Sequence, residues 1–170
     1  MGKATAYGWT PSFCLRIGRY RATRDRPGLM MQLDRAEGAA VVGVLHRLDP
    51  NREAAELAGL WRREMSVKPS GNLPLWIEVA ADDGRAVRAL AFTSNPEAGN
   101  YVGTLDPDEA AEMIAGACGP VGSCAEYLMQ TVAALAAHGI ADPYLDDLDA
   151  RVAARLNRLR SPAGSLGPHP

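Results

Sequence analysis

The sequence predicts a single α+β domain with a mixed or antiparallel sheet. The chain has 170 residues, of which 47% are apolar, and this is enough for one globular domain with its own core. Its first half holds short apolar runs separated by polar, turn-rich segments, as strands do, whereas its second half holds longer segments that begin with helix caps. Strands first and helices afterwards, without an internal repeat, favour the α+β class.

Five short apolar runs predict the strands. They are residues 13–17, 29–33, 41–48, 75–80 and 86–94. The segment RATRDRPG separates the first two runs and is predicted to be a loop, because it is charged and ends in Pro-Gly. A turn that contains Asp83 and Gly84 joins the last two runs, so these two strands are expected to form a β-hairpin.

One helix is predicted between the two groups of strands. Asp49 is expected at its N-cap and Pro50 at its first helical position. The helix should end near Glu64 or Met65, because the segment that follows, SVKPSGNLP, is rich in helix breakers.

Three further helices are predicted in the second half from the residues that would cap them. Asp106, Ser123 and Asp142 each stand where a helix should begin, and Glu126 completes a capping box with Ser123. Gly139 is expected just beyond the end of the middle helix.

Composition excludes several functional classes. The net charge is −2, from 18 basic and 20 acidic residues, so no overall field would attract nucleic acid or a membrane. Three cysteines without a CxxC pair indicate neither a disulfide framework nor a zinc site. The three histidines offer few ligands for a catalytic metal site. The start MGKATAYGW lacks an apolar h-region, so no signal peptide is expected, and no apolar run reaches roughly 18 residues. We therefore expect a reduced, cytoplasmic protein whose composition does not favour metal catalysis.

Glu64 is the main candidate for a functional residue, and it lies in the stretch LAGLWRREM. On a helix, Leu57, Leu60 and Trp61 share one face. Glu64 follows on that face, and Arg63 is expected to point away from it. In one interpretation Glu64 leans into solvent or pairs with Arg63. In the other it is partly desolvated at the negative pole of the helix, which would raise its pKa from about 4.3 and make it a general base at neutral pH.

The sequence resembles the ChaC family of gamma-glutamylcyclotransferases from about Tyr7 to Leu156. The resemblance depends on the order and spacing of seven runs together. They are GWTPSFCL (8–15), RDRPGLMMQLD (24–34), VVGVLHRL (41–48), LWRREM (60–65), VRALAFTSNPEAGNYVGTL (87–105), EMIAGACGPVGSCAEYL (112–128) and HGIADPYL (138–145). It implies a mixed β-barrel of the gamma-glutamylcyclotransferase-like type with flanking helices and a pocket at one end.

The implied activity is that of a lyase that cleaves glutathione, or a related gamma-glutamyl compound, to 5-oxoproline and cysteinylglycine without a metal or cofactor. The family's essential glutamate falls on Glu64, which would act as base and acid. Tyr101 matches a family tyrosine near the pocket, and it either binds substrate through its phenol or packs in the barrel wall. Arg26 is a weaker candidate for substrate contact, because without the resemblance its arginine-rich segment is more typical of a solvated loop.

The family's Tyr-Gly-Ser-Leu run, which ends its first strand, has no counterpart in this sequence. We therefore expect one N-terminally shortened domain over residues 1–160, followed by a disordered tail at 161–170. The alternative to an active enzyme is a catalytically impaired homologue that serves as a small-molecule-binding or interaction module. The sequence does not indicate an oligomeric state.

Overall fold

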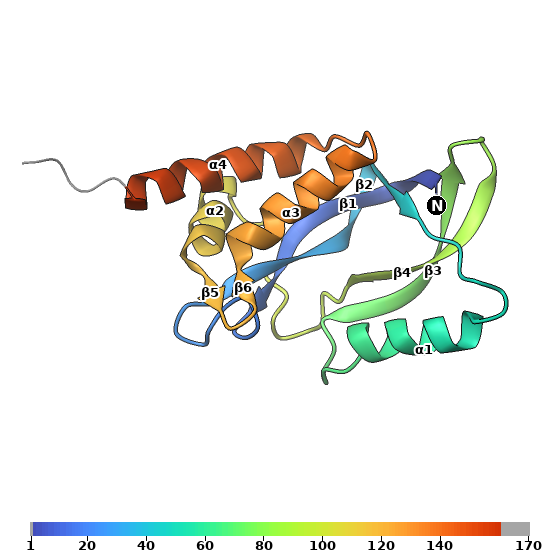
Figure 1. Cartoon of the computed structure of the whole chain (residues 1–170), viewed down its shortest axis with the longest axis horizontal. Helices are drawn as coiled ribbons and strands as arrows, with labels where there is room; N and C mark the ends of the chain where they lie inside the picture. Colours follow the sequence, from blue (N-terminus) through green and yellow to red (C-terminus); the bar gives the residue numbers. More distant parts are fainter. Residues whose placement is uncertain (1, 161–170) are drawn as a thin grey trace, which may run out of the picture.

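The fold is organised around two long antiparallel strands (Figure 1). The computed structural model describes residues 2–160; β1 spans Gly2–Ile17 and β2 spans Gly28–Leu45. The loop predicted between them is present at residues 18–27. The two strands are much longer than the apolar runs that predicted them.

The predicted strand boundaries are therefore corrected in two places. The run 13–17 is only the end of β1, and the runs 29–33 and 41–48 belong largely to the single strand β2, which stops at Leu45. Pairing with β1 carries β2 through the polar segment between the two runs. The register shifts beside Gly8, whose φ of 77° is one that glycine adopts without strain, so the pair accommodates a bulge there.

Strands β3 (Asn72–Ala81) and β4 (Ala86–Ser94) form the predicted hairpin. Gly84 in its turn has a φ of 80°, which again suits glycine. The four strands close into a barrel in the order β1-β2-β4-β3. β2 and β4 run parallel and the other neighbouring pairs are antiparallel, so the barrel is mixed, as the resemblance implied.

The barrel closes through short contacts. β1 meets β3 at two residue pairs, Ala4 with Ala81 and Thr5 with Ala80. β2 meets β4 at a single pair that involves Thr93, whose hydroxyl also donates to the Leu73 carbonyl at 3.2 Å. The β1–β2 and β3–β4 ladders are thus two extensive sheets joined by narrow seams.

Helix α1 (Glu53–Glu64) ends where the sequence predicts but begins later than expected. Its N-cap is Arg52, and Asp49 instead forms a turn in which its side chain accepts a hydrogen bond from the Asn51 N–H at 2.9 Å. None of the helix residues is buried. Trp61 is 47% exposed and meets Phe92 of β4 edge to face at 6.4 Å between ring centroids, so the predicted apolar stripe covers the sheet only partly.

The three predicted helices of the second half are confirmed as α2 (Pro107–Gly116), α3 (Cys124–Ala137) and α4 (Pro143–Arg160). The caps on Asp106 and Asp142 accept backbone N–H bonds, and the capping box at the start of α3 is formed in both directions. A small hairpin, β5 (Cys118–Gly119) with β6 (Gly122–Ser123), links α2 to α3.

These three helices pack on the β1–β2 pair and build the larger of two cores with it (Figure 1). Its largest buried side chains include Phe13, Leu29, Ile114, Leu128 and Leu148. The smaller core joins β1 to β3 and contains Ala4, Ala6, Trp9, Ile77 and Val79. The two cores therefore divide the molecule into a helix-backed half and a hairpin half.

None of the helices within residues 2–160 is long and apolar enough to cross a membrane. The tail predicted at 161–170 lies outside the described residues.

Candidate active site

Glu64 is the last residue of α1, and its carboxylate is held on both sides. The Nε of Arg63 lies 2.7 Å from Oε1, and the side-chain amide of Asn72 donates to Oε2 at 3.2 Å. The side chain is 27% exposed, so it is partly withdrawn from water. Arg63 does not point away as expected, because its long side chain folds back to the carboxylate of the next residue. The pairing that one sequence interpretation allowed is present.

Asn72 connects this carboxylate to a second polar group at the same end of the barrel. Asn72 is the first residue of β3 and stands opposite Ser94, the last residue of β4. The Ser94 hydroxyl donates to Oδ1 of Asp34 on β2. Tyr101 donates to the other oxygen of Asp34 at 2.9 Å. Three strands thus bring polar side chains together where the parallel seam closes the barrel.

Asp34 is a buried carboxylate held by neutral donors. It is only 5% exposed, and besides Ser94 and Tyr101 it accepts a hydrogen bond from the Arg35 N–H at 3.1 Å. No salt bridge to Asp34 is formed within the described part of the chain. These three donors satisfy much of the hydrogen-bonding capacity of a buried carboxylate, which would be costly to leave unpaired.

Tyr101 lies in the barrel wall, which is one of the two roles that the sequence left open, and its phenol binds Asp34. Its backbone pairs with Leu15 of β1 in an isolated bridge, so it is part of the barrel wall. Burial and then the hydrogen bond to Asp34 raise the pKa of its phenol to about 12. The phenol is therefore neutral at physiological pH and its proton is committed to Asp34. Its oxygen still has lone pairs that can accept a hydrogen bond.

Tyr127 of α3 lies on the side of the site that faces the helices. Burial raises the pKa of its phenol, Thr131 lowers it by a hydrogen bond, and the negative charge of Glu64 raises it further. Its ring meets Phe13 edge to face at 6.0 Å, and the Arg21 guanidinium lies 5.7 Å from its centroid. The field of Glu64 thus reaches across to α3.

Arg26 does not join this group in the described structure. It is exposed on the loop between β1 and β2, and its backbone N–H donates to the Thr23 hydroxyl at 3.1 Å. No contact of its side chain with Glu64 or Tyr101 occurs among residues 2–160. Nor does that part of the chain hold a group of three or more His, Cys, Asp or Glu side chains that could bind a metal ion.

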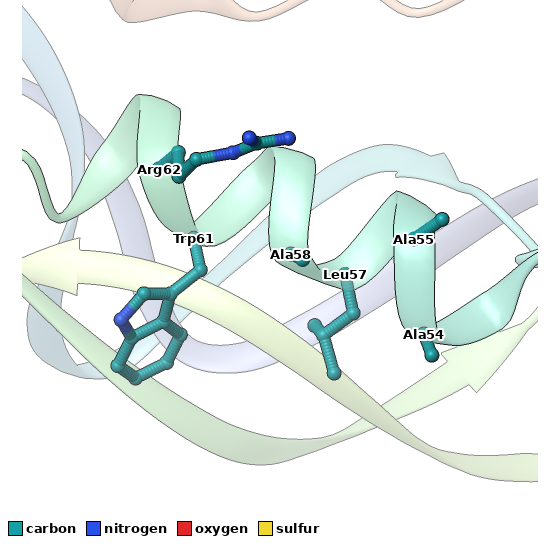
Figure 2. A pocket seen from close by; sticks show the side chains of 6 residues that line it. All are labelled: Ala54, Ala55, Leu57, Ala58, Trp61 and Arg62. Carbon is teal, nitrogen blue, oxygen red and sulfur yellow. The ribbon is translucent and has the colours of Figure 1, made fainter.

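Two surface hollows lie away from the polar cluster. The first follows α1 and is lined by Ala54, Ala55, Leu57, Ala58, Trp61 and Arg62. Figure 2 shows Leu57 and Trp61 extending from one side of the helix and Arg62 from the other. The second lies where α3 turns into α4. Neither hollow is lined by Glu64 or Tyr101, although the first ends one turn before Glu64.

The sequence selected Glu64 and Tyr101 but not the residues around them. Asn72 binds Glu64, Asp34 binds Tyr101, and Ser94 binds Asp34, and each of the three acquires its role from a residue on another element. The one signal for Asp34 in the sequence is a charged residue that directly follows the apolar run LMMQL. Asn72 and Ser94 carry no such signal, because polar residues are common where strands meet turns.

Comparisons with known proteins agree with one another on the family. The sequence profile of the ChaC-like protein family matches residues 1–155. The glutathione-specific gamma-glutamylcyclotransferase of Escherichia coli (strain K12) is 38% identical over 144 residues, which cover 85% of this chain and 61% of that protein. Gamma-glutamylcyclotransferase 2-3 of Arabidopsis thaliana is 26% identical over 133 residues, 76% of this chain and 67% of that protein. The chain thus spans about three fifths of the length of the E. coli relative.

The fold is also that of a solved structure. The crystal structure of a glutathione-specific gamma-glutamyl cyclotransferase from yeast superposes with a TM-score of 0.81, covering 94% of this chain and 90% of the yeast chain at 20% identity. At this identity the match is evidence for the fold alone. It confirms the predicted α+β class of the gamma-glutamylcyclotransferase type.

Proposed function

The chain belongs to the ChaC-like protein family, and from this premise we propose that it is a gamma-glutamylcyclotransferase that cleaves glutathione to 5-oxoproline and cysteinylglycine. The observation that carries the proposal is the Glu64 carboxylate, half-buried at the end of α1 and fixed by Asn72 of β3. The E. coli relative, 38% identical, is named for this activity. The reaction needs a single positioned carboxylate, which suits a site without a nucleophilic triad.

The chemistry follows from the substrate's own amine. At neutral pH the α-amino group of a gamma-glutamyl compound is mostly protonated, and Glu64 removes one proton from it. The freed nitrogen attacks the γ-carbonyl carbon and forms the carbon–nitrogen bond of a five-membered ring. The carbon–nitrogen bond to the cysteine residue then breaks as its nitrogen takes the first proton back from Glu64, and the ring nitrogen passes its second proton, by way of solvent, to the released amine. No water is consumed, so the two products contain all atoms of the substrate.

Glu64 keeps capacity for the substrate despite its two protein partners. An ionised carboxylate offers about four lone-pair sites, and Arg63 and Asn72 each occupy one. Arg63 is a mobile partner, because its side chain is 71% exposed and surface ion pairs contribute only about 0–1 kcal/mol. The approaching ammonium can therefore displace Arg63 from Oε1 at little cost.

Two further residues are proposed to contact substrate. Tyr101 has a phenol oxygen that accepts hydrogen bonds while its proton remains on Asp34, so it suits an N–H or ammonium group of the substrate. Arg26 has an exposed guanidinium that suits a substrate carboxylate. We further propose that residues 1–160 act as one domain and that the protein is cytoplasmic. Its three cysteines, Cys14, Cys118 and Cys124, are free, which fits a reducing compartment.

The test is release of 5-oxoproline from glutathione by the wild-type chain and by Glu64→Gln. Glutamine keeps the shape and an acceptor for Asn72 but cannot take a proton. We expect turnover to fall by about 10²–10⁴-fold, the usual contribution of a general base, with folding retained. Glu53→Gln is the matched control, because Glu53 is an exposed glutamate in the first turn of the same helix.

Equal turnover by wild type and Glu64→Gln would remove Glu64 from the mechanism. A folded wild-type chain that binds glutathione without releasing 5-oxoproline would instead identify a binding module. Calorimetric titration with glutathione measures the binding that the second result requires.

A further inference from the structure

One side-chain amide joins the end of α1 to the start of β3. Both hydrogens of the Asn72 –NH₂ group are used on Glu64: one bond goes to its main-chain carbonyl at 2.9 Å and the other to its carboxylate Oε2 at 3.2 Å. Both partner atoms accept hydrogen bonds and cannot donate them. The chemistry therefore fixes which end of the Asn72 amide is the nitrogen.

Asn72 is itself held by the strands and turn around it. Its backbone N–H donates to the Ser70 hydroxyl at 3.0 Å. From the end of β4, Asn95 binds the same turn twice, through its backbone N–H to the Gly71 carbonyl and through its side chain to the Ser70 carbonyl, each at 2.9 Å. The Asn72 side-chain amide that binds Glu64 is thus attached to a hairpin end that several hydrogen bonds hold in place.

The other partner of the carboxylate cannot provide this anchoring. Arg63 is the neighbouring residue on α1 and its side chain is 71% exposed, so it moves with the helix and with solvent. Asn72 is the one residue outside α1 that binds the Glu64 carboxylate within residues 2–160. Helix α1 has no buried residue of its own, so its last turn depends on such contacts for a fixed position.

From this geometry we propose that Asn72 is a positioning residue for Glu64, which caps the end of α1 and holds Oε2 in one orientation at the barrel end. This inference rests on the function proposed above. Its role is to keep the carboxylate where the substrate ammonium arrives, since a misplacement of about 1 Å reduces rates by about 10²-fold. Asn72 does not take or give a proton in this scheme.

The kinetic test uses substitutions that separate donation from shape. Asn72→Leu has a similar size but no donor, and we expect kcat to fall by about 10–100-fold with KM changed by less than about 3-fold. Asn72→Gln keeps an –NH₂ group on a longer arm and should recover part of the lost kcat. Asn51→Leu is the matched control: it makes the same change at an exposed asparagine before α1, whose backbone N–H donates to Asp49, and its kcat should stay within about 2-fold of wild type. A kcat for Asn72→Leu equal to that of Asn51→Leu would overturn the proposal.

A second measurement does not depend on turnover. Urea unfolding of wild type, Asn72→Leu, Glu64→Leu and the double variant forms a double-mutant cycle. We expect Asn72→Leu to lower the unfolding midpoint more when Glu64 is present than when it is leucine. Equal shifts in both backgrounds would show that the amide does not hold the carboxylate, and would overturn the proposal even for an inactive chain. If Asn72→Leu does not fold, Asn72→Ala, which also lacks the donor, takes its place in the cycle.

The two experiments also separate this inference from the proposed function. If wild type releases no 5-oxoproline, the proposed function fails while the cycle still reports on Asn72, and if Glu64→Gln retains full turnover, the role of Glu64 as base fails. If Glu64→Gln loses turnover but Asn72→Leu does not, only the positioning role fails.

Discussion

At the scale of single residues, Asp34 is a buried carboxylate that depends on its hydrogen-bond donors. It is 5% exposed and depends on Tyr101, Ser94 and a backbone N–H for its hydrogen bonds. Removing one donor leaves a buried charge partly unsatisfied, which costs about 1–3 kcal/mol. We therefore expect Tyr101→Phe to lower the free energy of unfolding by about that amount in urea titrations.

Tyr7→Phe is the control for Tyr101→Phe. Tyr7 is 67% exposed, so removal of its hydroxyl should change the free energy of unfolding by no more than about 0.5 kcal/mol. Equal stability of Tyr101→Phe and wild type would mean that the bond to Asp34 does not persist in solution.

The buried thiol of Cys14 should make stability depend on alkaline pH. Burial, and then the negative charge of Asp34, raise the pKa of Cys14 from 9.0 to about 11. The folded state thus favours the neutral thiol more than the unfolded state does, so the contribution is complete below pH 9 and is lost as the pH rises to about 11. We expect wild type to lose more unfolding free energy over this range than Cys14→Ala.

Urea titrations at several pH values between 8 and 11 check this expectation for Cys14. Burial also raises the pKa of Cys124, but that thiol is present in both proteins and cancels in the comparison. Parallel pH profiles for wild type and Cys14→Ala would show that Cys14 does not titrate in this range.

Residue-scale prediction from sequence succeeds where a residue's position on its own element is enough. Glu64 could be selected because helical spacing places it beyond an apolar stripe. Asp34, Ser94 and Asn72 could not, because their partners lie on other elements, which for Asp34 and Ser94 are far apart in the sequence. The prediction that Arg63 points away from Glu64 was also wrong, because helical spacing fixes where a Cβ points and not where a long side chain ends.

At the scale of elements, the helix caps offer a direct comparison of strong and weak signals. The Ser123 hydroxyl accepts from the Glu126 N–H at 3.1 Å, and the Glu126 carboxylate accepts from the Ser123 N–H at 2.9 Å. Asp49 caps no helix and only supports an exposed turn. We expect Ser123→Ala to cost about 1 kcal/mol of unfolding free energy and Asp49→Ala less than about 0.5 kcal/mol, by urea titration.

Similar effects of Ser123→Ala and Asp49→Ala would contradict the assignment of the cap. The two sites should differ because the side chains of Ser123 and Glu126 each bind the other residue's backbone N–H, whereas Asp49 caps no helix. The capping box satisfies two backbone donors at once, and a helix is packed behind it. Asp49 and Pro50 resemble a helix start in sequence, but the chain forms a turn there and α1 begins only at Glu53. Strand lengths were underestimated for a related reason, since pairing with a neighbour extends a strand beyond its apolar run.

At the scale of the whole molecule, the barrel could be expected only from the resemblance to a family. Periodicity predicts strands and a hairpin, but it carries no information about the parallel pair between β2 and β4 that closes the sheet. Beside that pairing, Leu33 of β2 packs against the smaller core and Ser94 of β4 donates to Asp34 of β2, and both contacts join residues far apart in the sequence.

The distribution of burial predicts that the two halves of the molecule differ in local stability. Strands β1 and β2 share the larger core with α2, α3 and α4, whereas β3, β4 and α1 are joined to them by the smaller core and by short seams. Helix α1 has no buried residue. Segments with few buried apolar contacts open at lower free energy than the global transition. Glu64 and Asn72 both belong to the weaker half, so the site should open together with it.

Native-state hydrogen exchange measured on peptides tests this division. We expect peptides from α1 and from the β3–β4 hairpin to exchange faster than those from β1, α2 and α4 at equal intrinsic rates, because their opening breaks only the seams. A ligand bound at Glu64 and Tyr101 would contact both halves, and should therefore slow exchange in the hairpin more than in the helices. Uniform protection across the chain, with or without glutathione, would contradict the division and show that the narrow seams hold as firmly as the long β1–β2 ladder.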